Sequence, residues 1–213
     1  MMLTLKELQT EAYATAREKG WHDRPLCKGT HLNRAPFDLS PAPIEPDHDR
    51  ILAKHALIHS EITEAVQALD DDERKMAIVD DKPEGFVVEI ADAIIRVCDT
   101  TAALGIAFNS IYEGADWTQR ASSMRMAIEI QAVDGHEQHV AVVLWCERAR
   151  QHVDLATEAV RVDDWVRYGE QCTHVVMTLA SVCAGLSLDL SEALRVKMAY
   201  NKTRPHRHGG KSA

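Results

Sequence analysis

The chain has 213 residues and carries 24 Lys and Arg against 33 Asp and Glu, a formal net charge of −9. This balance argues against a protein that binds a nucleic-acid backbone, which would be basic. No apolar run approaches the roughly 20 residues of a membrane span, and the N-terminus lacks the basic-then-apolar pattern of a signal peptide. We therefore expect a cytoplasmic globular protein with neither membranes nor nucleic acids among its partners.

Helical patterns cover most of the chain. Thr4 and Glu7 form a capping-box pattern at the start of the first predicted helix, and Gly20 follows its end. Five of the seven prolines fall within residues 25–47, which are predicted to be a loop. Residues 70–85 read as a charged connector. From apolar spacing we predict helices over residues 4–19, 48–69, 84–104, 107–118, 121–132, 137–161, 163–184 and 189–201.

The fold class follows from these elements. Long runs of alternating β-branched residues are missing, so we assign an all-α helical bundle that forms a single domain over residues 1–213.

Two parts of the chain resemble each other. ITEAV (62–66) is matched by ATEAV (156–160), and the apolar pattern of residues 90–108 is matched over residues 172–190. We therefore predict two degenerate copies of one helical hairpin, over residues 1–120 and 121–213. The alternative is that helices rich in Ala and Val resemble each other by chance.

Two acidic pairs occur in the first copy. Glu61 and Glu64 lie three residues apart on one predicted helix, and Glu89 and Asp92 on the next, each pair beside an apolar stripe. If the helices pack through those stripes, four carboxylates converge, and their repulsion would be relieved by a cation. An all-oxygen ligand set suits Mg²⁺, or Mn²⁺, rather than zinc.

Other readings of these acids exist. A single acidic pair is usually a solvated helix face, but two pairs beside apolar stripes on consecutive helices are less common. A di-iron bundle would need Glu-x-x-His on two helices, and the one such pair in the sequence is Glu45 with His48.

Several segments resemble the MazG-like, all-α nucleoside triphosphate pyrophosphohydrolases. They are HSEITEA (59–65), KPEGFVVEIADAIIRVCDTTAALGI (82–106) and KMAYNKTRPHRHGGK (197–211), while AREKGWHDRP (16–25) is similar to the lead-in of small phage and bacterial members. The pattern of this family is ExxE, a spacer and ExxD, and the matching positions are Glu61, Glu64, Glu89 and Asp92.

The resemblance implies an activity. A nucleoside triphosphate substrate would be hydrolysed between its α and β phosphates, giving a monophosphate and pyrophosphate, with Mg²⁺ held by the four carboxylates. Such ions neutralise phosphate oxygens and lower the pKa of a bound water. One of the four carboxylates could act as general base, but the sequence does not indicate which one.

The sequence departs from the short members of this family, because the basic tail motif follows the second copy and not the first. The four acidic positions read Leu155, Glu158, Gln171 and His174 in the second copy, which should therefore not hold metal in this way. We expect a fused pseudo-dimer whose first half supplies the metal ligands. Further pairing into a homo-oligomer stays open.

The C-terminal tail is strongly basic. Residues 193–213 hold six Lys and Arg and no acid, so residues 1–192 carry a net charge of −15. By resemblance, Lys197, Asn201 and Arg204 would bind the phosphates of the substrate. The alternative is a solvated basic helix end that suits the helix dipole.

A few more side chains are candidates. Trp21 and His22 could stack on or hydrogen-bond a base, although Trp21 could equally close the first helix onto the bundle. His55 and His59 lie one turn apart just before Glu61. They could approach the site or cap its rim, and they receive no ligand role. Asp99 is expected to support the metal ligands, or to pair with Arg96 or with a cation of the second copy.

We therefore expect a Mg²⁺-dependent nucleotide pyrophosphohydrolase that acts on a ribo- or deoxyribonucleoside triphosphate. A catalytically silent helical module that binds a nucleotide or a protein is the main alternative. A DNA-associated protein is disfavoured, because the body is acidic and no recognition helix is evident.

Overall fold

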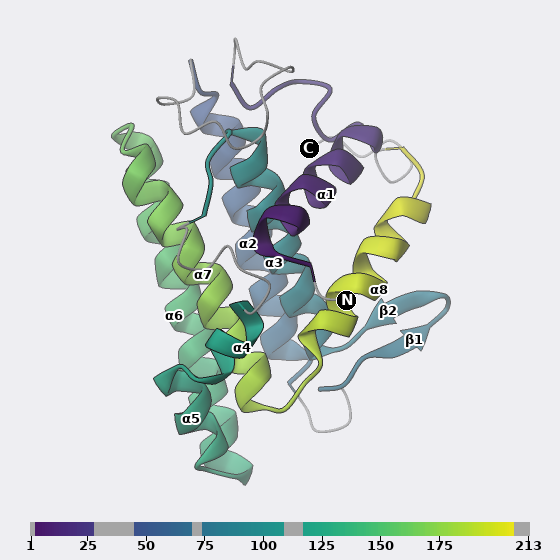
Figure 1. The fold of residues 1–213 in the computed structure, drawn as a ribbon, viewed down its shortest axis with the longest axis vertical. Helices are drawn as coiled ribbons and strands as arrows, with labels where there is room; N and C mark the ends of the chain where they lie inside the picture. The colour runs from purple at the N-terminus through teal and green to yellow at the C-terminus, as the bar shows by residue number, and fades with distance from the viewer. Residues whose placement is uncertain (1–2, 28–44, 70–73, 109–116, 207–213) are drawn as a thin grey trace.

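The structure is a computed structural model, and it describes residues 3–27, 45–69, 74–108 and 117–206. Within these ranges there are eight α-helices and one two-stranded antiparallel sheet, so the all-α prediction is confirmed (Figure 1). The elements are α1 (Leu5–Glu18), α2 (His48–Gln67), β1 (Ala77–Val79), β2 (Lys82–Glu84), α3 (Phe86–Ala103), α4 (Trp117–Ser122), α5 (Arg125–Gln131), α6 (Gly135–Arg161), α7 (Trp165–Gly185) and α8 (Leu190–Thr203).

Most predicted helices are found within two or three residues of their expected ends. The exceptions are the helix predicted over 121–132, which begins four residues later at Arg125, and the helix predicted over 107–118. Residues 106–108 are not helical, residues 109–116 lie outside the described ranges, and α4 begins at Trp117. Gly105, which was expected to end α3, adopts a φ of +70°.

The ends of α1 follow from local sequence. The Thr4 hydroxyl accepts from the Glu7 N–H at 3.1 Å, and the Glu7 carboxylate accepts from the Thr4 N–H at 2.8 Å, which is a capping box. At the other end Gly20 has a φ of +78°, and the Trp21 N–H donates to the Ala16 carbonyl at 3.0 Å. This Schellman turn directs the chain back towards the bundle.

The charged connector contains a β-hairpin that the sequence analysis did not predict. Asp80 and Asp81 join β1 to β2, and their φ values of 50° and 62° are those of a two-residue type I′ turn. Each strand has three residues, too few for an alternating pattern to stand out. Gly85 then leads directly into α3.

The Pro-rich segment is described only at its two ends. Cys27 and Pro46 form an antiparallel bridge, and the Asp47 N–H donates to the Leu26 carbonyl at 2.7 Å. Residues 28–44, the greater part of the predicted loop, lie outside the described ranges.

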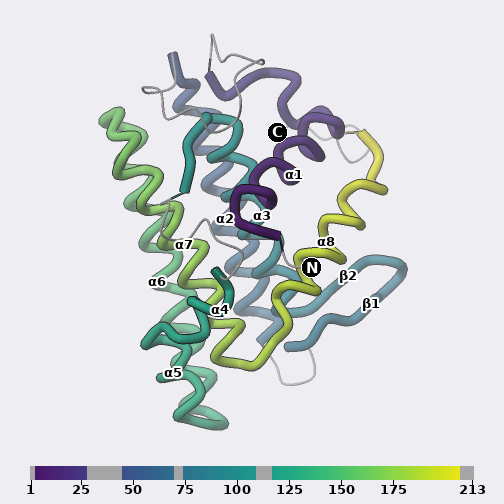
Figure 2. Tube along the Cα trace, in the orientation of Figure 1, coloured from purple at the N-terminus to yellow at the C-terminus, as the bar shows by residue number. Residues whose placement is uncertain are grey.

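The helices form three layers (Figure 1). α6 and α7 pack on each other, α2 and α3 form the middle layer, and α1 and α8 cover the other side of α3. The tube in Figure 2 shows the same order, with the hairpin of β1 and β2 beside α8. As the central helix, α3 is buried at every residue except Arg96.

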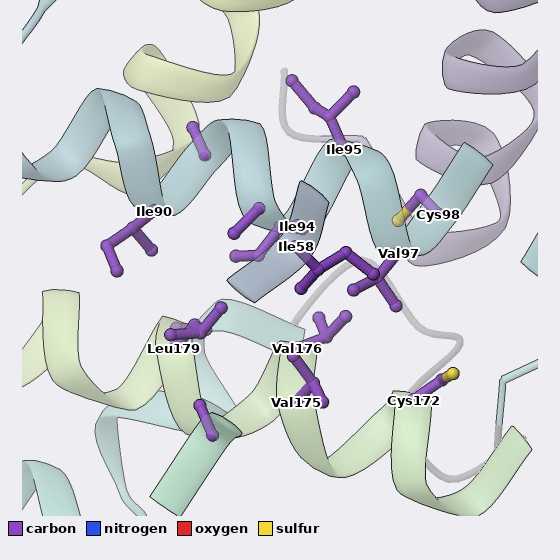
Figure 3. Packing of buried hydrophobic residues seen from close by; sticks show 14 of the residues in the cluster. Ile58, Ile90, Ile94, Ile95, Val97, Cys98, Cys172, Val175, Val176 and Leu179 are labelled. Carbon is purple, nitrogen blue, oxygen red and sulfur yellow. The ribbon is translucent and has the colours of Figure 1, made fainter. Parts of the chain in front are cut away.

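The core lies between α3 and α7. Figure 3 shows Ile94 and Val97 of α3 facing Val176 of α7, with Ile58 of α2 beside them. Ile95 points away from α7, to the face that α1 and α8 cover. The helical hairpin of α2 and α3 (the first hairpin) and that of α6 and α7 (the second hairpin) therefore share one apolar core.

The short helices are exchanged between the two hairpins. α4 and α5 follow α3 in the chain but pack on α7, whereas α8 follows α7 and packs mainly on α3. The predicted division at residue 120 falls inside α4. That the hairpins are degenerate copies of one unit stays a prediction.

By length and apolar character, no single helix in the described part of the chain would cross a membrane. α7 and α8 meet that requirement only as a pair, and they are bent by 119° at their junction.

Candidate functional site

Three of the four predicted acidic residues come together between α2 and α3. Glu61 projects from α2, and Glu89 and Asp92 project from one face of α3. One carboxylate oxygen from each lies within 4.8 Å of the other two, and all three side chains are buried. This is a ligand group that could hold a hard cation such as Mg²⁺.

The fourth predicted acid, Glu64, lies outside this group. Its side chain is exposed, and its carboxylate accepts a hydrogen bond from the Ser60 hydroxyl at 2.8 Å. The helix carries it one turn beyond Glu61, close enough for its charge to act on the Glu61 carboxyl group.

Two cations are built into the acidic group. Arg96 Nε donates a hydrogen bond to Oε1 of Glu61 at 2.7 Å, and Nη2 of the same guanidinium lies 2.6 Å from that oxygen. Lys197 of α8 places Nζ 3.2 Å from Oδ2 of Asp92, although its side chain is only 3% exposed. Two cations therefore lie against three buried carboxylates. The sequence analysis anticipated a role for Lys197, but it did not assign Arg96 to this site.

Burial and mutual repulsion shape the ionisation of these acids. Burial, opposed by Lys197 and reinforced by Asp92 and Glu61, raises the pKa of Glu89 to about 7. Burial and the neighbouring Asp92 also raise the pKa of Glu61. Burial would raise the pKa of Asp92 as well, but Arg96 and Lys197 bring it below its usual value. A group of like charges held this closely attracts any further positive charge.

A pocket opens beside the acidic group. Its cavity volume is about 80 Å³, and it opens to solvent among α1, α2, α3 and α8. Asp92 and Arg96 line it, so the pocket reaches the acidic group. Trp21, Asn201 and Arg204, three of the predicted substrate-binding residues, line it as well.

The C-terminal tail contributes to this site from one face of α8. Lys197 contacts Asp92 directly, while Asn201 lies one turn further along and faces the pocket. Arg204 packs its guanidinium over the Tyr200 ring, 5.7 Å from the ring centre. The solvated-tail alternative thus does not describe these residues, whereas Lys202 is exposed and pairs with Glu11 on α1.

A second polar cluster lines the pocket further along α3. Asp99 accepts from Lys54 Nζ at 3.4 Å, and its other oxygen lies 2.6 Å from Nε2 of His22. The Lys54 ammonium lies 5.9 Å from the ring centre of Trp21. The expected partners of Asp99, Arg96 or a second-copy cation, are therefore replaced by two residues of the first copy.

The sequence contained a signal for this cluster. Lys54 precedes Glu61 by seven residues on α2, and Asp99 follows Asp92 by seven on α3. In an antiparallel helix pair these matched spacings bring Lys54 to Asp99 wherever Glu61 meets Asp92.

His55 and His59 face α6 and α7, away from the acids. His55 Nδ1 lies 2.7 Å from the Thr157 hydroxyl, and its ring stacks on Tyr168. His59 Nε2 lies 3.2 Å from the Asp154 carboxylate. Both histidines therefore join the two hairpins.

The corresponding positions of the second hairpin form no such acidic group. Glu158 is exposed and pairs with Arg167 at 3.5 Å, and the His174 ring stacks on His152. The Gln171 amide oxygen accepts a hydrogen bond from His152 Nδ1 at 2.8 Å. Among the described residues, one group alone has the composition and spacing of a metal site, and it lies in the first hairpin.

Comparison with known proteins adds no relative. No protein-family model, no curated protein and no solved structure matches the chain.

Proposed function

We propose that this protein is a Mg²⁺-dependent nucleoside triphosphate pyrophosphohydrolase, which releases a monophosphate and pyrophosphate. The observation that carries the proposal is the group of three buried carboxylates, Glu61, Glu89 and Asp92. One of them, Asp92, lines a pocket that cations also line. Burying three carboxylates so near one another costs free energy, and apolar side chains would stabilise a core better. A role in binding a cation explains why the acids lie there.

The acidic group would hold the metal. Its three members offer carboxylate oxygens and no nitrogen or sulfur, the ligand chemistry that Mg²⁺ and Mn²⁺ favour. When bound, the ion would offset phosphate charge and make a coordinated water more acidic. Glu64, beside the group on α2, is the proposed fourth ligand or the base that accepts the proton of the attacking water.

The cations of the site would hold the phosphates. Arg96 and Arg204 line the pocket, and Lys197 lies behind Asp92. A guanidinium can donate two parallel hydrogen bonds to a phosphate, so the arginines suit a triphosphate chain. Arg96 could then donate to a substrate phosphate in place of Glu61, which would leave that carboxylate to hold the metal.

The test is turnover of a panel of ribo- and deoxyribonucleoside triphosphates with Mg²⁺, with products identified by phosphorus NMR. We expect a nucleoside monophosphate and pyrophosphate, and loss of turnover when the metal is chelated. The kcat of the variant Glu89→Gln should be lower by at least about a hundredfold, because removing one group that stabilises charge in the transition state has an effect of that size.

Glu158→Gln makes the same change at a control position, because Glu158 is exposed and lies outside the acidic group. It should retain full activity. Release of inorganic phosphate alone, or no turnover of any nucleotide, would contradict the proposal.

A second candidate is a nucleotide-binding module without catalysis. The observation in its favour is that Arg96 and Lys197 already pair with Glu61 and Asp92, so the acids are largely compensated by protein cations. Calorimetric titration that detects binding of a nucleoside triphosphate, with no product after prolonged incubation, would support this reading.

A further inference from the structure

The pocket contains a buried ammonium group with unused hydrogen-bonding capacity. Lys54 lines the pocket, and its side chain is only 10% exposed. An ammonium carries three N–H donors. In the described structure its one hydrogen-bond partner is the Asp99 carboxylate, at the long distance of 3.4 Å. Donors buried without partners are costly, so the site favours a ligand that supplies an acceptor.

Asp99, the partner of Lys54, has a hydrogen-bond partner for each of its two carboxylate oxygens. One of its oxygens is 2.6 Å from His22, and the other accepts from Lys54. The spare capacity at this place is therefore that of a donor, and a group facing Lys54 should be an acceptor such as a carbonyl oxygen.

The distance from the acidic group suits a nucleoside. Asp92 and Asp99 are seven residues apart on α3, which corresponds to about 10 Å along the helix. A nucleotide whose phosphates lie at Asp92 and Arg96 can extend along α3 so that its base reaches Lys54. Trp21, whose ring lies beside the Lys54 ammonium, would pack against that base.

Building on the proposed function, we propose that Lys54 selects the base of the substrate by donating a hydrogen bond to an exocyclic carbonyl oxygen. The substrate class is then the nucleotides with an oxo group at pyrimidine position 4 or purine position 6, namely those of uracil, thymine, hypoxanthine and guanine. Bases with an amino group at that position, cytosine and adenine, would turn a donor towards a cation and be disfavoured.

Two matched pairs of substrates test this in the unmodified protein. dUTP and dCTP differ at pyrimidine position 4, and dITP and dATP differ at purine position 6. We expect kcat/KM to favour the oxo member of each pair by roughly ten- to a hundredfold, the range for a hydrogen bond from a charged donor. Equal rates, or preference for the amino members, would overturn the inference.

The variant Lys54→Met removes the donor at similar side-chain length. It should lower kcat/KM for dUTP and dITP towards the values for dCTP and dATP, which should change little. Lys202→Met, the same change at an exposed lysine on α8, should keep the preference. A uniform loss on all four substrates would instead identify Lys54 as a phosphate ligand and overturn the inference.

These outcomes separate the two proposals. Absence of any turnover removes the proposed function, whereas turnover without discrimination removes only the role of Lys54. Should Lys54→Met fail to fold, the paired substrates in the unmodified protein still decide the question.

Discussion

Individual buried charges dominate the chemistry of this molecule. Lys197 is buried and ends beside Asp92, and the half-buried Arg96 ends beside Glu61. Ionised side chains are seldom buried without a partner. Each of these cations therefore stabilises the fold only through the acid that it faces, and removing one exposes the repulsion among the others.

The first prediction concerns Lys197. Lys197→Met leaves three clustered carboxylates with Arg96 as their nearest cation, so we expect the free energy of unfolding to fall by about 3–5 kcal/mol without metal. If the acids bind Mg²⁺, adding it should raise the melting temperature of this variant more than that of the unmodified protein. Thermal unfolding with and without Mg²⁺ measures both effects.

Lys202→Met serves as control, because Lys202 is exposed. It should alter neither the stability nor the response to Mg²⁺ by more than a few tenths of a kcal/mol. If the two variants lowered the free energy of unfolding equally, the loss in Lys197→Met could not be attributed to the burial of Lys197 beside Asp92.

The second prediction concerns pH. Burial, with His59 close by, lowers the pKa of His55 from its ordinary 6.5 to about 4. Between these values the unfolded chain binds a proton that the folded chain does not, so the contribution of His55 to stability is complete above pH 6.5. It should be lost as the pH falls towards 4, by up to about 3 kcal/mol, and change little below that.

Urea unfolding between pH 7.5 and 4 checks this. His55→Phe should be less stable at neutral pH, because the contact with Thr157 is lost, but its stability should fall less steeply with acid. His136→Phe alters an exposed histidine and should leave the slope unchanged. If the free energy of unfolding fell equally steeply with acid in all three proteins, the loss of stability could not be due to protonation of His55.

At the scale of elements, the close approach of α5 to α7 depends on one glycine. A Cβ at Gly185 would lie 2.7 Å from Cβ of Ile130 and 3.2 Å from the Ala127 carbonyl oxygen. Both atoms belong to the backbone or the base of a side chain, so they cannot move without moving α5. The absence of a side chain at this position is therefore what lets the short helix pack on the core.

Gly185→Ala tests this contact. Helix propensity alone would make alanine stabilising by about 1 kcal/mol, but overpacking should reverse the sign and lower the free energy of unfolding by about 1–3 kcal/mol. Gly169→Ala, where the nearest atom is the γ2 methyl of Ile106 at 3.0 Å, should cost less. Chemical denaturation ranks the two, and a stabilised Gly185→Ala protein would disprove the steric argument.

At the scale of the whole molecule, the two hairpins share one core. α2 packs on α6 and α3 on α7, while the short helices cross from one hairpin to the other. Figure 3 shows that the seam is made of side chains from both halves, such as Ile94 and Val176. Neither hairpin buries its apolar face without the other, so the chain should unfold as one unit.

The corresponding prediction is a single unfolding transition. Helix content by circular dichroism and fluorescence of the tryptophans, which occur in both halves at positions 21, 117, 145 and 165, should report the same urea midpoint. Val176→Ala at the seam should lower that midpoint, for a loss of about 2 kcal/mol, without splitting the transition. Two separate midpoints would mean that the hairpins fold independently.

Much of this molecule is determined by the sequence alone. The capping box at Thr4, the turn at Gly20 and the apolar spacing of the long helices are local signals, and they predicted the helical class and most helix bounds. The same periodicity placed Glu89 and Asp92 on one face of α3 and indicated that they meet Glu61. Except for the meeting with Glu61, which joins two consecutive helices, these features depend on residues within one or two turns of each other, where side-chain geometry follows directly from helical spacing.

Other features were decided only by tertiary structure. The hairpin at Asp80 and Asp81, the exposure of Glu64, and the pairing of Lys54 with Asp99 and of Lys197 with Asp92 were not predicted. Each pair joins residues from two different helices, and the choice among partners depends on how those helices cross. Because the energy of a buried charge depends on distances of a few ångströms, the packing of the helices selected these pairs among those that the sequence spacing allows.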